Sequence, residues 1–168
     1  MRKRKNIKNY IFCFIAMMCI YSCIWGAGSY VYSEVYLLNI SSAQELILTI
    51  NAMKQKDDSL NIYYTNENGD TVSMDGISYS FYMSHFKIDS IGYMCAINLN
   101  QKKEKMVAIQ FVSIAIGEGI DKNDWKRINT EELSKKDNEK YKKLFEENIL
   151  NRLCIPWRKH QLSDFFDN

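Results

Sequence analysis

Two long apolar segments near the middle of the chain constrain its fold more than any other feature. Residues 91–99 and 106–116 are almost free of charge, and the polar segment 100–104 joins them. Apolar runs of this length, bounded by polar turns, are typical of buried neighbouring strands. We therefore expect both segments to lie at the centre of an antiparallel sheet.

Shorter alternating segments precede these two. Asn68 and Gly69 separate residues 60–65 from residues 71–74, and both residue types tolerate the positive φ of a tight turn, which predicts a hairpin. After it, serines alternate with apolar residues, which predicts a strand with one buried and one solvated side. The apolar positions are Ile77, Tyr79, Phe81 and Met83. Tyr82 interrupts the solvated side, and we expect it to be exposed.

Helix signals flank this run of strands. Ser41 with Gln44, or Ser42 with Glu45, forms a capping box. Apolar side chains follow at helical spacing, and cations that favour a helix C-terminus come after them. These residues are Leu46, Ile47, Ile50 and Met53, then Lys54 and Lys56. A second apolar stripe, which Pro156 terminates, predicts a C-terminal helix. It consists of Tyr141, Leu144, Phe145, Ile149 and Leu153.

This order of elements predicts an α+β fold. We expect a two-layer sandwich in which an antiparallel meander of four to five strands is covered by an N-terminal and a C-terminal helix. Residues 41–155 are expected to form this one domain, and residues 156–168 a polar C-terminal tail.

The first 33 residues form a segment of another kind. Five basic residues precede an apolar run from Tyr10 to Ile20, and the first acidic residue is Glu34. A cationic end followed by a short apolar stretch is typical of an export signal. The sequence Ile20-Tyr21-Ser22-Cys23 resembles the lipobox of bacterial lipoprotein signals; Tyr21 is larger than the residue usual at its position.

The resemblance implies that residues 1–22 are a cleaved signal peptide and that Cys23 is acylated. Residues 23–40 would then form a lipidated tether or edge segment. Two or more acyl chains would anchor it stably to the membrane. The expected location is the bacterial cell envelope, at the outer membrane or the periplasmic face. An uncleaved transmembrane helix within residues 9–33, which carry no charge, and a soluble export product remain open.

The charge of the exported domain bears on its partners, and its cysteines bear on whether it holds a disulfide. Five of the 22 basic residues lie in the leader, which leaves 17 against 20 acidic residues and a net charge of about −3. Domains that bind nucleic acid usually carry a basic surface, whereas this domain would be negatively charged. We therefore do not expect it to bind nucleic acid. Cys95 and Cys154 would be the cysteines left in the exported domain, and they either pair or stay apart.

The candidates for chemistry are few. His85 and His160 stand in no known catalytic spacing, and neither they nor the cysteines offer the paired ligands of a zinc site. Gly117-Glu118-Gly119 lacks the pattern of a phosphate loop. The acidic loop after it lacks the spacing of a calcium loop; its polar residues are Glu118, Asp121, Asn123 and Asp124. We expect no cofactor and no metal.

The favoured function is therefore a membrane-anchored lipoprotein that binds a protein partner or acts as an accessory module; immunity against a secreted toxin is one form of this. Aromatic residues at strand or loop positions form the candidate partner surface: Tyr63, Tyr82, Trp125 and Trp157. The alternatives are a membrane-tethered enzyme that uses His85 or residues 118–124, and a single-pass transmembrane component of the envelope.

Overall fold

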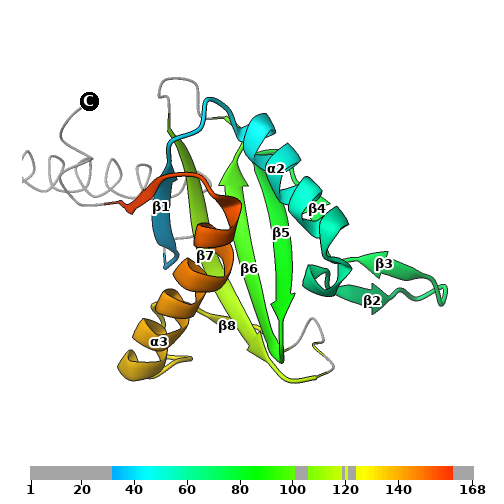
Figure 1. Ribbon diagram of the computed structural model, residues 1–168. Helices are drawn as coiled ribbons and strands as arrows, with labels where there is room; N and C mark the ends of the chain where they lie inside the picture. Colours follow the sequence, from blue (N-terminus) through cyan, green and yellow to red (C-terminus); the bar gives the residue numbers. More distant parts are fainter. Residues whose placement is uncertain (1–31, 101–105, 119, 121–123, 161–168) are drawn as a thin grey trace, which may run out of the picture. The chain divides into compact units, whose positions relative to one another are not determined.

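A seven-stranded antiparallel sheet dominates the protein (Figure 1). The computed structural model describes residues 32–100, 106–118, 120 and 124–160. The strands lie in the order β4, β5, β6, β7, β1, β9, and β8 also pairs with β7. Their bounds are β4 Gly76–Ile77, β5 Phe81–Ile88, β6 Ile91–Asn98, β7 Val107–Ile116, β1 Glu34–Leu38, β9 Trp157–Lys159 and β8 Lys126–Arg127.

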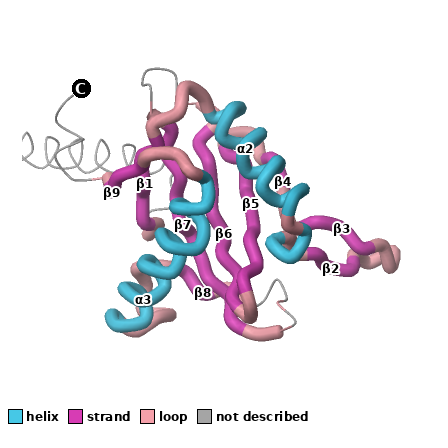
Figure 2. The backbone as a smooth tube through the Cα atoms, in the orientation of Figure 1, coloured by secondary structure: helices cyan, strands magenta, loops and turns pink. Residues whose placement is uncertain are grey.

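Two further strands and two helices complete the described region. β2 (Tyr63–Thr65) and β3 (Thr71–Ser73) form a separate hairpin that projects away from the large sheet (Figure 2). The helix α2 (Ala43–Lys56) precedes a short 3-10 turn, Asp58–Leu60. The helix α3 (Lys135–Phe145) continues through a π-helical turn, Glu146–Leu150, and a 3-10 turn, Asn151–Leu153. Both helices lie on the same face of the sheet.

The predicted fold class, a helix-covered meander of four to five strands, is wrong. The sheet has seven strands, and its order is not that of a meander because β1 inserts between β7 and β9. Glu34 pairs with Phe111, and Tyr36 pairs with both Ile109 and Lys159. Residues 23–40 were expected to supply at most an edge segment, yet β1 is an internal strand. Pairing between the two ends of a chain leaves no local periodicity, which is why the sequence pattern does not predict it.

Several local predictions are confirmed. β6 and β7 are central strands, and Gly69, with a φ of 86°, turns the predicted hairpin. The Ser42 side chain caps α2 by accepting a hydrogen bond from the backbone N–H of Glu45, with an N···O distance of 3.1 Å. The cap of α3, which the sequence pattern did not single out, is Ser134; it accepts from the N–H of Asp137 at 3.1 Å.

The helix-covered face of the sheet holds the main core. Phe145 of α3 stacks on Phe111 of β7, with ring centroids 4.3 Å apart. Leu46 and Ile50 of α2 belong to the same cluster of buried side chains. A smaller cluster contains Phe81, Ala96 and Val112. The sequence pattern correctly predicts that both helices are amphipathic and cover the sheet. Burial of their apolar faces stabilises the packing of the helices on the sheet.

The alternating segment that begins at Ile77 does not form one strand but is divided between β4 and β5. The backbone N–H of Ser78 donates to the carbonyl oxygen of Phe81 at 2.8 Å, so the chain turns between them. Ile77 and Tyr79 are therefore exposed, whereas Tyr82, which we expected to be exposed, is only 6% accessible. Among the described residues, no helix is both long enough and apolar enough to cross a bilayer.

Candidate functional site

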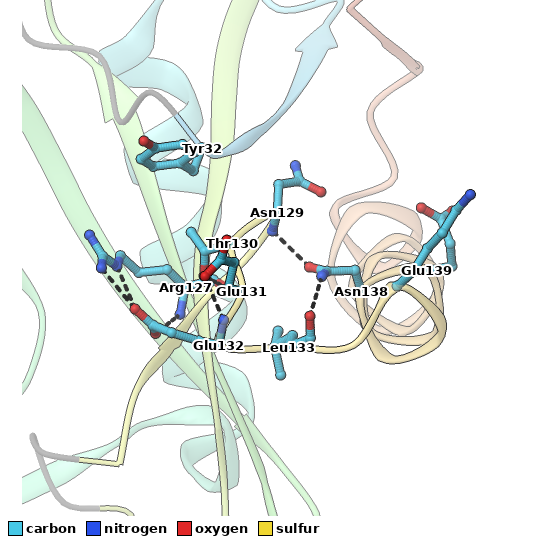
Figure 3. Close-up of a pocket in the computed structure, with 10 residues that line it drawn as sticks. Tyr32, Arg127, Asn129, Thr130, Glu131, Glu132, Leu133, Asn138 and Glu139 are labelled. Atoms are coloured by element: carbon cyan, nitrogen blue, oxygen red, sulfur yellow. Dashed lines mark hydrogen bonds and ion pairs between the residues drawn. The ribbon is translucent and has the colours of Figure 1, made fainter.

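A polar hollow lies where the chain leaves β8 and enters α3 (Figure 3). It is open to solvent and has a volume of about 880 Å³. It is lined by Tyr32, Arg127, Asn129, Thr130, Glu131, Glu132, Leu133, Lys135, Asn138 and Glu139. Most of these side chains are polar, so the hollow presents hydrogen-bonding groups rather than an apolar wall.

Buried Asn138 holds the wall of this hollow in place. Its Oδ1 accepts from the backbone N–H of Asn129 at 2.7 Å, and its Nδ2 donates to the carbonyl oxygen of Leu133 at 3.2 Å. Asn129 has a φ of 59°, a left-handed conformation that asparagine tolerates better than most residues. The loop is therefore fixed by an amide whose polar atoms are used internally.

The charges around the hollow are largely paired. Arg127 Nη2 lies 2.8 Å from Glu132 Oε1, and Lys142 Nζ lies 2.6 Å from Glu139 Oε1. Hydrogen bonds from the Arg127 backbone and side chain hold the pKa of Glu132 below its usual range. No histidine or cysteine is among the described residues that line the hollow. This geometry suits polar recognition.

A second candidate is a buried charged cluster beside β5. Lys54 Nζ donates to Asp75 Oδ2 and to the carbonyl oxygen of His85, both at 2.6 Å. Asp75 Oδ1 accepts from the backbone N–H of His85 at 2.8 Å. Only 5% of the Lys54 side chain and 17% of that of Asp75 are exposed. Burial opposes ionisation of Asp75, but His85 and Lys54 together hold its pKa below the usual range.

This cluster completes the backbone hydrogen bonding of β5. β4 pairs with β5 as far as Met83, and Asn61 makes an isolated bridge with Phe86. Between these points, the N–H and C=O of His85 bond to Asp75 and Lys54 instead of to a neighbouring strand. Buried backbone groups need such partners. The ion pair thus fills a gap in the sheet, which is a structural role.

The His85 ring is enclosed rather than presented to a substrate. It packs edge-on against Trp125, with centroids 5.3 Å apart, and its Nδ1 lies 3.8 Å from Asp75 Oδ1, too far for a hydrogen bond. Trp125 reaches this position across Gly92, where an added Cβ would stand 3.0 Å from Trp125 Cη2. His85 Nδ1 and Trp125 Nε1 are buried without hydrogen-bond partners. A general base must instead reach the proton of a bound substrate.

The other chemical candidates do not converge. His160 lies just after β9, where its backbone N–H donates to Val35, far along the sheet order from His85. Asp121 and Asn123 lie outside the described residues, as does Cys23. Within the described ranges, no three histidine, cysteine, aspartate or glutamate side chains gather as metal ligands.

The two cysteines of the domain are not paired. Cys95 is buried in β6 and Cys154 is exposed at the end of the 3-10 turn, and both are free thiols. Burial raises the pKa of Cys95 to about 12. Cys95 is therefore a protonated core residue at neutral pH.

The four aromatic residues of the candidate partner surface lie apart. Tyr82 is buried and donates to Asn51 Oδ1 at 3.0 Å, and Trp157 of β9 packs edge-on against Tyr36 of β1. Trp125 covers Gly92. Tyr63 is the exposed member, and its hydroxyl donates to Asp58 Oδ1 at 2.8 Å. The structure thus joins Trp125 to His85 but brings no two of the four aromatics together.

Four residues that the structure makes prominent had no functional role in the sequence pattern: Lys54, Asp75, Ile77 and Tyr79. Lys54 falls on the apolar stripe of α2, four residues after Ile50, and this spacing signals burial. Asp75 is the one charge between residues 71 and 86. The exposure of Ile77 and Tyr79 has no such local signal.

Comparisons with known proteins add no function to this geometry. No protein-family model, curated protein sequence or solved structure matches the chain. The functional argument therefore rests on the residues themselves.

Proposed function

We propose that the chain is a lipoprotein of the bacterial envelope, anchored through acylated Cys23, and that its domain acts by binding a protein partner. The proposal joins two separate arguments. One concerns the address carried by residues 1–23, and the other concerns the surface of the described domain.

The N-terminal residues support a lipid anchor through their charge and their spacing. Basic residues, the apolar run from Tyr10 to Ile20 and Ile20-Tyr21-Ser22-Cys23 occur in the order that an export signal with a lipidated cysteine requires. The positive end favours translocation of the part that follows. Lipidation would tie the domain to a membrane and leave its surface free to meet partners.

The binding argument rests on exposed apolar side chains at an outer strand of the sheet. Ile77 is 75% exposed and Tyr79 is 98% exposed, and both lie at or next to β4. Tyrosine is enriched among the residues that dominate protein interfaces. These two side chains are the observation that supports a binding function most directly.

Metabolic labelling with an alkyne analogue of palmitate tests the anchor. We expect label on the full-length protein, loss of label in Cys23→Ala, and unchanged label in Cys19→Ala, because Cys19 lies in the segment that processing removes. Intact mass should show loss of residues 1–22 and a gain of lipid. An unlabelled product that retains Met1 would contradict the anchor.

Binding is tested separately from anchoring. Chemical crosslinking in intact cells, followed by membrane solubilisation, should yield a defined heteromeric adduct of the full-length protein that Ile77→Lys weakens. The matched control is Ile116→Lys, which places the same charge at another exposed isoleucine. An adduct that both variants weaken equally would argue against an interface at β4.

A further inference from the structure

The two outer strands of the large sheet are β4 and β9, and β4 leaves its outer side open. Ile77 pairs with Tyr82 of β5. The next pair along, Ser78 and Phe81, is hydrogen-bonded through the Ser78 N–H. Because hydrogen-bonded and non-hydrogen-bonded pairs alternate in an antiparallel ladder, the N–H and C=O of Ile77 point away from β5. No described residue bonds to them.

The side chains around this edge are apolar and exposed. The Ile77 side chain projects from the same face as Tyr82, its cross-strand neighbour. The Tyr82 hydroxyl contacts Asn51 of α2, and Leu48, three residues before Asn51 on the same helix face, is also exposed. Leu48 in α2, Ile77 in β4 and Tyr79 just after β4 are thus exposed apolar side chains on elements at or next to an unpaired strand edge. Natural sheets usually protect such edges with lysine, proline or a cover.

The residues around β4 carry a negative net charge. Residues 57–86 contain five acidic residues and no lysine or arginine. Arg152 pairs with Asp57 and Lys54 pairs with Asp75. The other three have no ion-pair partner among the described residues; they are Asp58, Glu67 and Asp70. The hairpin beside the edge is therefore a region of negative charge.

A notch between α2 and the base of the hairpin offers a seat for a cation. Its volume is about 290 Å³, and its lining includes Asp58, Tyr63, Asp75 and Lys54. Lys54 is paired with Asp75, so Asp58 carries the uncompensated negative charge of the notch. Asp58 accepts from Tyr63 and Asn61 through Oδ1 alone, which leaves Oδ2 for another donor. These hydrogen bonds hold the pKa of Asp58 below its usual range. A lysine or arginine side chain fits this charge and this size.

We propose that β4 is the docking site for an extended segment of a partner protein that carries alternating basic and apolar side chains. The segment adds to the sheet as a strand through the backbone groups of Ile77, which is an established mode of peptide recognition. Its apolar side chains pack on Leu48, Ile77 and Tyr79, and a basic side chain reaches Asp58. This inference rests on the proposed partner-binding function and names its site and the class of its partner.

Three synthetic peptides test the docking mode on the full-length protein in detergent micelles. The probe is a capped heptapeptide of alternating lysine and valine. One control replaces lysine with glutamate, and the other is N-methylated at every residue, so that neither of its edges can donate hydrogen bonds to a strand. We expect the probe to slow hydrogen exchange of the Ile77 amide by about tenfold or more, because pairing protects an edge amide. Both controls should leave that exchange rate unchanged.

Variants distinguish the contribution of the strand edge to peptide binding from that of the acidic residues. Ile77→Lys should weaken probe binding by about tenfold or more, because a lysine blocks edge pairing, whereas Ile116→Lys should bind as the unmodified protein does. A triple variant with Asp58→Asn, Glu67→Gln and Asp70→Asn should weaken binding and remove most of its salt dependence. Equal binding of the glutamate or N-methylated peptide, or no protection of Ile77, would overturn the proposal.

Two further outcomes are decisive. If Ile77→Lys changes only the oligomeric state of the protein, the edge serves a second copy and the assigned partner is wrong. Cys23→Ala should leave peptide binding intact, so failed lipid labelling would reject the anchor alone. Failed peptide binding with normal labelling would reject the edge alone.

Discussion

The two flanks of the sheet arrange charge and apolar surface in opposite ways. The β4–β5 flank buries an ion pair, Lys54 with Asp75, and exposes Ile77 and Tyr79. At the β1–β9 flank, Trp157 packs edge-on against Tyr36, and the outer strand β9 exposes charged side chains. There the exposed strand residues are Arg158 and Lys159.

The β1–β9 flank follows the usual rules for a sheet edge, and the β4–β5 flank departs from them. Burying a charge costs free energy unless it is paired, and leaving an apolar edge open invites association. Departures of this kind concentrate at functional sites in natural proteins. The comparison therefore directs attention to β4 without any appeal to a catalytic motif.

The largest expected effect comes from removing the buried cation. Lys54→Met leaves Asp75 without its ion-pair partner and the His85 carbonyl without its donor, so unfolding free energy should fall by about 3–5 kcal/mol. Lys159→Met is the matched control, because the Lys159 side chain is 45% exposed and Glu146, its ion-pair partner, keeps the hydrogen bond from Tyr36, so its cost should be the smaller, about 1 kcal/mol. Urea denaturation measures both. Equal losses would break the comparison between the flanks.

Acid should weaken the β4–β5 flank through Asp75. The folded protein lowers the pKa of this carboxyl group from its ordinary value of 3.8, so the unfolded chain takes up the proton first as pH falls. The stabilisation is complete well above pH 3.8 and is lost as pH falls through the lower folded-state pKa. Asp75→Asn should be less stable at neutral pH and show a shallower loss in acid.

Urea midpoints collected from neutral pH down to pH 2 measure this dependence. Glu139→Gln is the control, because Glu139 is an exposed carboxylate whose pKa Lys142 also lowers. A curve for Asp75→Asn parallel to that of the unmodified protein would assign the acid sensitivity to other groups.

Removing the charges of β9 should make the two edges alike. Arg158→Val with Lys159→Val leaves an outer strand with no charged residue, which we expect to promote self-association while changing stability only slightly, since both side chains are exposed. Light scattering over a concentration series measures the association. An unchanged mass at high concentration would show that charge is not what protects this edge.

The smallest perturbation is labelling of the thiols. Cys154, just before β9, should react with iodoacetamide in the native protein, whereas Cys95 should react only after unfolding because burial raises its pKa to about 12. Peptide mass mapping distinguishes the two sites. Rapid native labelling of Cys95 would mean that the β5–β6 region opens readily.

The parts of the fold that follow from local pattern were predictable. Asn68-Gly69 indicated the hairpin, and Ser42 with Glu45 indicated the start of α2. Pairing of β1 with β7 and β9 was not, because it joins residues at least 69 positions apart and depends on which edges remain available after the central strands pair.

The candidate site was predictable only in part. His85 was singled out from the sequence, but its burial against Trp125 depends on the absence of a side chain at Gly92, on another strand. Lys54 was interpreted as a cation at a helix end, whereas its position on the buried stripe of α2 was the more informative signal. The exposure of Ile77 depends on the turn at Ser78, which interrupts an otherwise regular alternation.

The internal position of β1 has a mechanical consequence. Tension applied at Tyr32 along the strand axis enters β1, whose backbone is bonded to β7 on one side and to β9 on the other. Pulled in that direction, both ladders are loaded in shear, so their hydrogen bonds share the force instead of opening one after another. We therefore expect β1 to resist being pulled out of the sheet when force is applied along its axis.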